Sequence, residues 1–587
     1  MTSFPAWPAV AALILVGVAT LGVGTLGLRL SRTTSDFYVA SRAVSPLWNA
    51  SAIGGEYLSA ASFLGIAGLT LAYGGDILWY PLGYTAGYLV LLALVAAPLR
   101  RSGAYTLPDF AEIRLGSLSV RRMSSTLVVG IGWLYLLAQF HASGLALRTV
   151  TGAPSWLGGT LVSVIVLINV VAGGMRSITF VQAFQFWLKL TAISIPLIIL
   201  IFVWRADGAP DPAGPAVPRV STQTSVTVPE SLRVRVTYPI TVQVDGVVNG
   251  TAVDGPMRWE AGEVDLARGT QVTLPAGAPV PHAHGIDVSD GQDWVTPSSG
   301  AGGREYPLYR VYSLLLALLF GTMGLPHVLV RFYTNPTGRA ARRTTLAVIP
   351  LLGLFYLFPP FYGALGRLYT PELLLTGRTD AVVLLLPSRM VGHPWAEILT
   401  ALVTAGAFAA FLSTSSGLTV SVAGVLSQDL LRGRLRTSVQ GFRIGSLIAV
   451  VVPAALSAIT IKVSIADTVG LAFAVAASTF CPLLVLGIWW RGLTRMGAQV
   501  GLVVGGTLAV AATLITIAGG TSSRLANALL AQPAAWSVPI AFALMVGVSL
   551  ATRRTAPPDA ARVLVRLHAP EGLGLHAGPG GDAVTGR

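Results

Sequence analysis

Long apolar runs dominate this sequence and decide what it can fold into. Stretches such as 8–30, 77–98 and 496–518 reach the roughly 20 residues that a helix needs to cross the hydrocarbon core of a bilayer. Only 11% of the 587 residues are charged, whereas a soluble domain carries about 25%. Because a backbone in lipid has to satisfy its own hydrogen bonds, these runs have to form helices. The sequence therefore predicts an all-α integral membrane protein.

About thirteen runs are long enough to be membrane spans. The first lacks a basic segment before it and a small-residue cleavage site after it, so we expect a retained span rather than a signal peptide. The predicted spans are 8–30, 46–73, 77–98, 124–147, 156–174, 180–204, 309–330, 344–366, 396–426, 442–461, 465–489, 496–518 and 535–552.

Arginines gather in alternate loops between these spans. Arg100 and Arg101 follow the third span, and Arg342 and Arg343 follow the seventh. Loops rich in Lys and Arg stay in the cytoplasm. We therefore expect a multi-pass protein of the plasma membrane with its N-terminus outside and its C-terminus in the cytoplasm. The net charge of +14 fits this orientation better than a nucleic-acid partner.

Two stretches lack membrane character and divide the chain. Arg233–Thr237 and Ile240–Val244 alternate apolar and polar residues, and Asp245-Gly246 is a turn signal. We predict a small β-rich extracytoplasmic insertion there and, because the end of the chain is rich in Pro and Gly, a disordered cytoplasmic tail. The expected domains are 1–204 and 307–552 in the membrane, 205–306 outside and 553–587 in the cytoplasm.

Two spans carry residues that interrupt a helix at mid-membrane depth. The second contains Gly54-Gly55-Glu56, and the seventh contains Gly321-Thr322-Met323-Gly324-Leu325-Pro326. Non-helical backbone at this depth is tolerated where it lines a cavity, although small residues also serve ordinary helix packing. The two spans lie five apart, which indicates a five-plus-five inverted repeat with a solute site at the breaks. Half-helix N-termini there would face an anionic group, and free carbonyls would face a cation.

The ninth span contains the hydroxyl run Ser413-Thr414-Ser415-Ser416. Such hydroxyls often bond to carbonyls of their own helix or to a neighbouring helix. Alternatively they bind a hard cation, which prefers oxygen ligands. Both interpretations remain open from the residues alone.

Several ionisable residues lie within apolar runs. Glu56 and Lys189 are candidates for the coupling of solute to cation, because an intramembrane charge is a functional hypothesis by default. Glu56 could instead only fix helix packing, and Lys189 could pair with an acid or a carbonyl, or extend to the membrane surface. We expect His327 and Arg331 to act as interfacial anchors rather than as a gate.

Other chemistries find little support. His282 and His284, with Asp287, have a spacing that a metal could use, but a third defined ligand is missing. Cys481 alone cannot form an internal disulfide. We expect no enzyme, no cofactor and no metal beyond sodium.

Four stretches resemble the sodium/solute symporter family, and within it the acetate permease branch. They are 36–42, 57–68, 173–177 and 321–333. The resemblance covers nearly all spans up to about Trp490 and leaves out the insertion and the tail. It implies the leucine-transporter-type fold, with a five-plus-five inverted repeat and extra flanking helices.

The resemblance also implies the positions of the binding sites. Sodium would be bound by backbone oxygens of Gly55, Leu58 and Ala410 and by the hydroxyls of Ser413 and Thr414. The substrate-binding residues would be Ser59, Ser62, Gln139, Gly321, Thr322 and Gly324.

This chain departs from the family pattern at two places. Many sodium-coupled members carry an aspartate after a threonine at the start of the sixth span, whereas here Thr179 is followed by Phe180. Acetate-type relatives often carry apolar residues where this chain has Ser413 and Thr414. The first difference weakens the case for sodium and the second strengthens it.

Together these features predict a secondary symporter in which sodium drives uptake of a short-chain monocarboxylate such as acetate, propionate or pyruvate. The partners would be the carboxylate, sodium and the lipid bilayer, with no nucleic acid. The alternatives are proton coupling through Glu56, a symporter of another small solute, or a transporter-like nutrient sensor.

Overall fold

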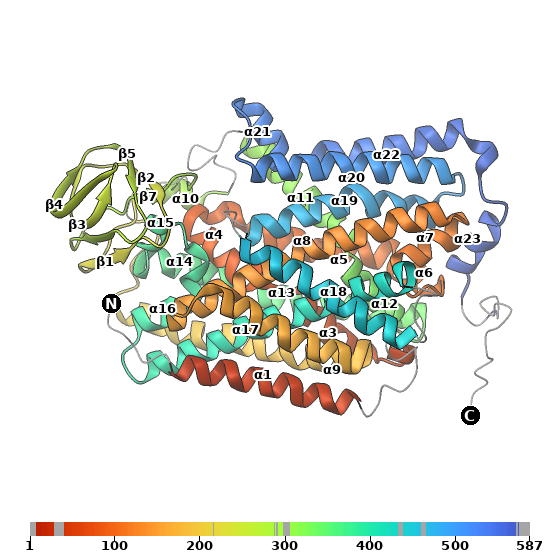
Figure 1. Cartoon of the computed structure of the whole chain (residues 1–587), viewed down its shortest axis with the longest axis horizontal. Coiled ribbons are helices and arrows are strands. Elements are labelled where there is room, and N and C mark those ends of the chain that lie inside the picture. The colour runs from red at the N-terminus through yellow and green to blue at the C-terminus, as the bar shows by residue number, and fades with distance from the viewer. Residues whose placement is uncertain are drawn as a thin grey trace.

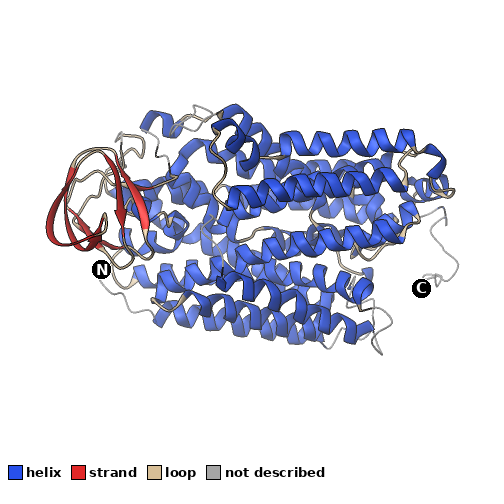
Figure 2. Cartoon of the chain, turned by 45° about the horizontal axis from the view of Figure 1, so that its top comes forward, coloured by secondary structure: helices blue, strands red, loops and turns tan. Residues whose placement is uncertain are grey.

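The computed structural model describes residues 7–28, 40–214, 217–286, 288, 291–297, 306–431, 438–459, 465–570 and 573. Long helices run side by side along the long axis of the molecule, and a β-rich unit lies at one end of them (Figure 1). Helices, drawn in blue in Figure 2, make up nearly all of the remaining structure.

The helices follow the apolar runs. Their bounds are α1 (Trp7–Leu28), α3 (Pro46–Tyr57), α4 (Ile66–Tyr73), α5 (Trp79–Leu94), α6 (Ala96–Arg101), α7 (Leu107–Leu115), α8 (Leu118–Thr151), α9 (Ser155–Ala206), α10 (Gly291–Val295), α11 (Pro307–Gly324), α12 (Pro326–Tyr333), α13 (Gly338–Tyr356), α14 (Pro359–Tyr369), α15 (Leu373–Thr376), α16 (Val382–Met390), α17 (Trp395–Val425), α18 (Ser438–Ile459), α19 (Ile465–Trp489), α20 (Arg495–Ile517), α21 (Arg524–Ala531), α22 (Ala534–Ala551) and α23 (Ala560–His568).

Among the described residues, eleven helical segments are long and apolar enough to cross a membrane. The difference from the predicted thirteen arises at two places. The predicted spans 46–73 and 77–98 share one segment, Ala61–Leu94. The predicted spans 156–174 and 180–204 both fall within α9, which leaves helical geometry at Gly174 (φ 56°, ψ −155°). The count of thirteen and the inverted repeat stay predictions.

Both predicted breaks are confirmed. The second span stops at Tyr57, the end of α3, and Leu58 leaves the helical region with φ −74° and ψ 84° before a π-type turn, η2 (Ala61–Gly65), leads into α4. The seventh span stops at Gly324, and Leu325 takes φ −73° and ψ 115°. Pro326 starts α12 because proline has no N–H to continue α11 but fits the first turn of a new helix.

The insertion folds into a curled antiparallel sheet, shown in red in Figure 2. Its strands are β1 (Thr224–Thr227), β2 (Leu232–Val236), β3 (Ile240–Val248), β4 (Thr251–Trp259), β5 (Gly262–Leu266), β6 (Gln271–Leu274) and β7 (His282–Ala283). The spatial order is β1-β6-β3-β5-β2-β7, and β4 pairs with β3. The predicted β-rich character is therefore correct.

The predicted turn at Asp245-Gly246 is wrong. Both residues lie inside β3, where Asp245 pairs with Asp254 and Gly246 with Val253. The chain reverses at Asn249-Gly250 instead, with φ of 50° and 80°. A two-residue hairpin turn needs positive φ at both positions, which asparagine and glycine adopt at low cost.

The insertion is fastened to α4, the second half of the broken span. Trp294 in α10 donates its indole N–H to the carbonyl oxygens of Thr70 at 3.0 Å and Leu71 at 3.3 Å. These two carbonyls lie in the last turn of α4, where the Thr70 oxygen also accepts the N–H of Gly74. The side chain of Trp294 is only 5% exposed, so the contact is a buried helix cap.

The tail is ordered over part of its length. Residues Ala560–His568 form α23, which packs on α6 and α7 and buries Leu567. Arg101 donates to the His568 carbonyl oxygen at 3.1 Å. The prediction of a disordered tail is therefore wrong for this segment, because an amphipathic helix with a protein surface beside it buries its apolar face. The stretch from 574 onward lies outside the described residues.

Candidate transport site

The break in the second span leaves carbonyl oxygens without helical partners. Beyond Tyr57 the chain no longer offers N–H groups in helical register, so the oxygens of Gly55 and Leu58 are available to other donors. Gly55 also lets α3 approach α9 closely, because a Cβ there would lie 2.1 Å from the Gln182 carbonyl oxygen.

The Lys189 ammonium group occupies the space between these oxygens. Its Nζ donates to the carbonyl oxygen of Gly55, to the carbonyl oxygen of Leu58 at 2.7 Å and to Ser413 Oγ at 2.9 Å. Lys189 is fully buried in α9. An ammonium group has three N–H donors, so this one is completely satisfied.

The other predicted sodium ligands lie beside this group. Ser413 Oγ donates to the Ala410 carbonyl oxygen at 3.1 Å, and Thr414 Oγ1 donates to the Glu56 carbonyl oxygen at 2.6 Å. The structure thus brings together the broken second span and the hydroxyl run of α17, as expected. Sodium binding by these residues stays a prediction.

Glu56 forms a buried ion pair that the sequence did not reveal. Arg331 Nε lies 2.5 Å from Glu56 Oε2, and neither residue is more than 1% exposed. Arg331 also donates to Thr179 Oγ1 at 2.8 Å and to Gln182 Oε1. Interfacial anchoring is therefore the wrong interpretation of Arg331. This residue of α12 lies deep in the protein, against α3 and α9.

Three predicted substrate-binding side chains form hydrogen bonds at the broken spans. Gln139 Oε1 accepts the N–H of Ala60 at 3.1 Å, directly after the break. Ser62 Oγ lies 2.9 Å from the Tyr356 hydroxyl, and Thr322 Oγ1 lies 2.8 Å from the Tyr57 hydroxyl.

Gly321 and Gly324 serve close helix packing. A Cβ on Gly321 would lie 2.6 Å from the Phe473 carbonyl oxygen, and one on Gly324 would lie 2.3 Å from the Ala476 carbonyl oxygen. Both glycines therefore let α11 pack tightly on α19. Substrate contact by these residues stays a prediction.

An aromatic cluster surrounds the breaks. Ring centroids are separated by 4.9 Å for Tyr57 and Tyr88, 5.2 Å for Tyr84 and Phe473, and 5.3 Å for Tyr135 and His327. The sequence alone does not indicate this cluster, because aromatic residues in apolar spans are common and give no periodic signal. The cluster closes the region in the conformation seen here.

Some buried donors near the second-span break have no hydrogen-bond partner. They include Gln139 Nε2 and the Tyr88 hydroxyl. Buried polar groups are normally paired, and an unpaired one costs about 1–3 kcal/mol. Unpaired donors beside a broken helix fit an anionic oxygen ligand.

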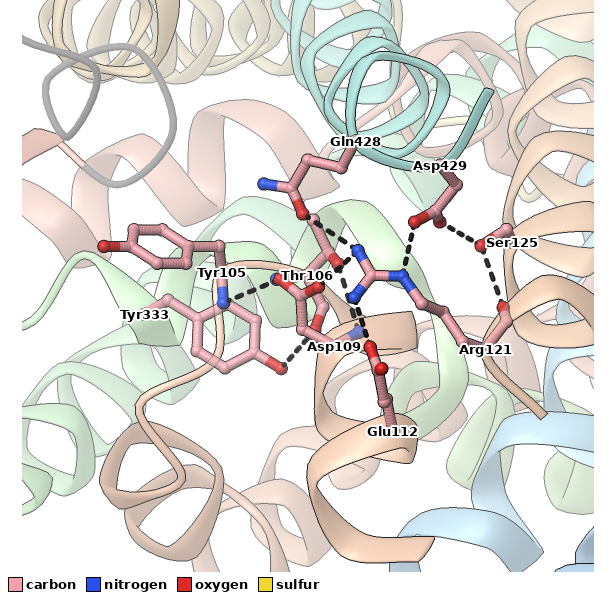
Figure 3. Close-up of polar contacts among 9 residues, drawn as sticks. All are labelled: Tyr105, Thr106, Asp109, Glu112, Arg121, Ser125, Tyr333, Gln428 and Asp429. Carbon is pink, nitrogen blue, oxygen red and sulfur yellow. Dashed lines mark hydrogen bonds and ion pairs between the residues drawn. The ribbon is translucent and has the colours of Figure 1, made fainter. Parts of the chain in front are cut away.

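A second polar network lies at the N-terminal end of α8 (Figure 3). Arg121 is surrounded by three carboxylates, with N–O distances of 2.8 Å to Asp109, 2.5 Å to Glu112 and 2.5 Å to Asp429. Ser125 also donates to Asp429. The network joins α7, α8 and the turn η6 (Leu426–Leu430) that follows α17.

Asp109 holds this network to the start of α7. Its carboxylate accepts the backbone N–H groups of Tyr105 at 3.2 Å and Thr106 at 3.1 Å, and Thr106 Oγ1 caps the helix in return. Burial raises the pKa of Asp109 above its usual value, while Arg121 opposes that rise. Sequence reasoning missed the network, because its members lie in loops and helix ends far apart in the chain.

Metal ligation in the insertion finds no support among the described residues. No group of three or more His, Cys, Asp or Glu side chains is placed there to hold an ion. His284 lies 3.2 Å from Glu263, and Asp287 lies outside the described part of the chain.

The model of the sodium:solute symporter family matches residues 37–240 and 282–505. This chain belongs to that family. The match stops within the insertion and resumes at its last strand, so the spans carry it. The resemblance inferred from the sequence is therefore confirmed at the level of the family.

Relatives of known or assigned transport function are similar over most of their length. A monocarboxylic acid transporter of Corynebacterium glutamicum is 28% identical over 546 residues, which is 88% of this chain and 87% of that protein. An uncharacterized symporter of Bacillus subtilis, YwcA, is 27% identical over 576 residues, covering 95% and 97%.

Solved structures share the fold. A sodium-coupled sialic acid symporter superposes with a TM-score of 0.63 at 14% identity, covering 93% of this chain and 97% of that one. The nucleobase-cation-symport-1 family transporter Mhp1 gives 0.51 at 13% identity, covering 91% and 99%. The chain therefore shares the fold of these transporters.

Proposed function

We propose that this protein carries a short-chain monocarboxylate, such as acetate, propionate or pyruvate, across the plasma membrane together with a cation. The observation that carries the proposal is the excess of positive charge at the centre. Glu56 pairs with Arg331, whereas Lys189 bonds only to neutral oxygens. With Lys189 as an ammonium group, which its three acceptors fit, two buried cations and one anion leave one positive charge. A buried charge is costly unless it is paired, so an anion is the ligand that this centre favours.

The unpaired donors support a carboxylate in particular. Gln139 lies at the break of the second span, and Tyr88 packs against Tyr57. A carboxylate has two acceptor oxygens that such donors would satisfy. Aromatic side chains around them suit a short apolar substituent.

The relatives support the same class of substrate. The protein from Corynebacterium glutamicum is described as a monocarboxylic acid transporter. That description belongs to the relative, and it supports the proposal because 88% of this chain aligns with it.

Transport would proceed by alternating access. The residues at the two breaks are buried, so the solute enters and leaves only when one half of the structure moves relative to the other. On the predicted cytoplasmic side, the Arg121 network would have to separate before release. Gln139 would hold the free N–H of Ala60 and so keep the break open to solute.

Uptake of labelled acetate into proteoliposomes tests the proposal. The sodium and the proton gradient are imposed separately, and we expect concentrative uptake under at least one of them. Propionate and pyruvate should compete with acetate, whereas uncharged acetamide should not. The variant Gln139→Leu should raise KM, and Thr191→Val, on the exposed face of α9, should not. Uptake that never exceeds equilibrium under either gradient would overturn the symporter proposal. Equal competition by acetamide would overturn the carboxylate.

A further inference from the structure

We infer that the Lys189 ammonium group is the resident cation of the site that the family resemblance assigns to sodium, and that sodium does not share this site with it. The inference rests on the proposed function only in treating the site as part of the transport machinery. It concerns which cation the oxygens of Gly55, Leu58 and Ser413 bind.

The oxygens are already used. Gly55, Leu58 and Ser413 each accept one N–H from Lys189, which accounts for all three donors of the ammonium group. An ion placed among the same oxygens would lie against Nζ, and the two positive charges would repel each other. The site therefore holds the lysine or a sodium ion, but not both.

The remaining predicted ligands are also satisfied without an ion. The Ala410 carbonyl oxygen accepts the Ser413 hydroxyl, and the Thr414 hydroxyl donates to the Glu56 backbone. None of the five predicted ligands is left as an unpaired buried atom. In contrast, unpaired donors do remain near the break, at Gln139 and Tyr88.

Lys189 is suited to this position. Its ammonium group is a compact point charge, as sodium is, whereas an arginine fork would not fit three convergent oxygens. The side chain is fully buried and comes from the middle of α9, so it does not extend to the membrane surface. Because it is covalently attached, its effective concentration at the site is far above that of a dissolved ion.

Removal of the lysine should open the site to sodium. We would compare thermal unfolding of the purified protein in NaCl and in choline chloride at equal ionic strength. We expect no sodium-specific shift of Tm in the wild type and a saturable rise of several degrees in Lys189→Met. Stabilisation by a ligand that binds only the folded state rises with its concentration in this way. The added variant Lys189→Met/Ser413→Ala should lose the rise, and Thr191→Val should behave as wild type.

Two results would overturn the inference. One is a sodium-specific shift in the wild type that Ser413→Ala abolishes. The other is a folded Lys189→Met that gains no sodium response. If Lys189→Met does not fold, the wild type and Ser413→Ala are compared on their own. A sodium-specific rise of the wild-type Tm that depends on Ser413 contradicts the inference, and the absence of such a rise supports it. Unfolding does not depend on acetate uptake, so failure of the proposed function would leave this result standing.

Discussion

Glu56 and Arg331 connect the two broken spans, since Glu56 belongs to α3 and Arg331 to α12. The pair is buried, and Gly417 makes room for it, because a Cβ there would lie 2.0 Å from Glu56 Oε1. Two charges taken out of water attract each other strongly, but their net contribution to stability is small. Removal of one partner lowers stability much more, because the other charge then stays buried without a counter-charge.

We therefore expect Glu56→Gln to lower the free energy of unfolding by about 3–5 kcal/mol, since Arg331 stays charged without an anionic partner. The double variant Glu56→Gln/Arg331→Met should lose much less than the sum of the two single variants. Urea unfolding of the four proteins in detergent measures the cycle. Additive losses would mean that the two side chains do not act as a pair.

The residues of the site were partly predictable. Glu56 and Lys189 are conspicuous because charges are rare in apolar runs. Their partners were not predictable, because one sequence gives no distance between spans. Arg331 lies near the end of its span, where an anchor is the ordinary interpretation, and only the structure places it against Glu56.

At the scale of elements, the broken α11–α12 span depends on its fit to α19. Gly321 and Gly324 face the backbone of α19, and the two helices lie so close together that a Cβ at either glycine would overlap that backbone. Small residues at helix contacts of this kind are what hold membrane helices together.

Gly324→Ala should reduce stability by about 1–3 kcal/mol, since the added Cβ would lie 2.3 Å from the Ala476 carbonyl oxygen and α19 must move. Gly353→Ala in α13 is the matched control, because no atom lies within 4 Å of the position a Cβ would take. Thermal unfolding of both variants checks the difference. Equal midpoints would mean that α11 tolerates the displacement.

The elements themselves follow from the sequence more closely than their ends do. Helix breaks at Leu58 and Leu325 were predictable because glycine, proline and polar residues have to be accounted for in lipid. The turn of the β3–β4 hairpin was misplaced by four residues, because Asp245-Gly246 and Asn249-Gly250 are both good turn pairs. Tertiary pairing along β3 decides between them. The helix α23 depends on contacts with α6 and α7 that no local pattern reveals.

At the scale of the whole molecule, the Arg121 network holds together helix ends on the predicted cytoplasmic side. Beside it lies a cavity of about 10 Å³, lined by residues that include Thr106, Pro326 and Ser421. This volume holds about one water molecule and is too small for a carboxylate to pass. The network would therefore stabilise the closed cytoplasmic side.

Arg121→Gln should shift the protein toward a state that is open to the cytoplasm, because three carboxylates then lose their shared cation. A cysteine in place of Ser421 should react with maleimide at least several-fold faster in that background when the reagent reaches the cytoplasmic face. The native Cys481 is fully buried and provides a silent background. Unchanged labelling would mean that the network does not control access.

The predicted orientation is testable in whole cells. An impermeant maleimide should label Thr251→Cys, on the exposed hairpin of the insertion, in intact cells. Ala561→Cys, exposed on α23, should be labelled only after permeabilisation. The reverse pattern would place the N-terminus in the cytoplasm and invert the assignment of both faces.

The cap that Trp294 places on α4 couples the insertion mechanically to the span that carries the solute break. Force applied to the insertion would reach the broken span without any reagent entering the membrane. An antibody fragment that holds the sheet against the helix bundle should thus inhibit transport non-competitively. A ligand of the solvent-accessible insertion would then regulate a transport site whose own residues are buried.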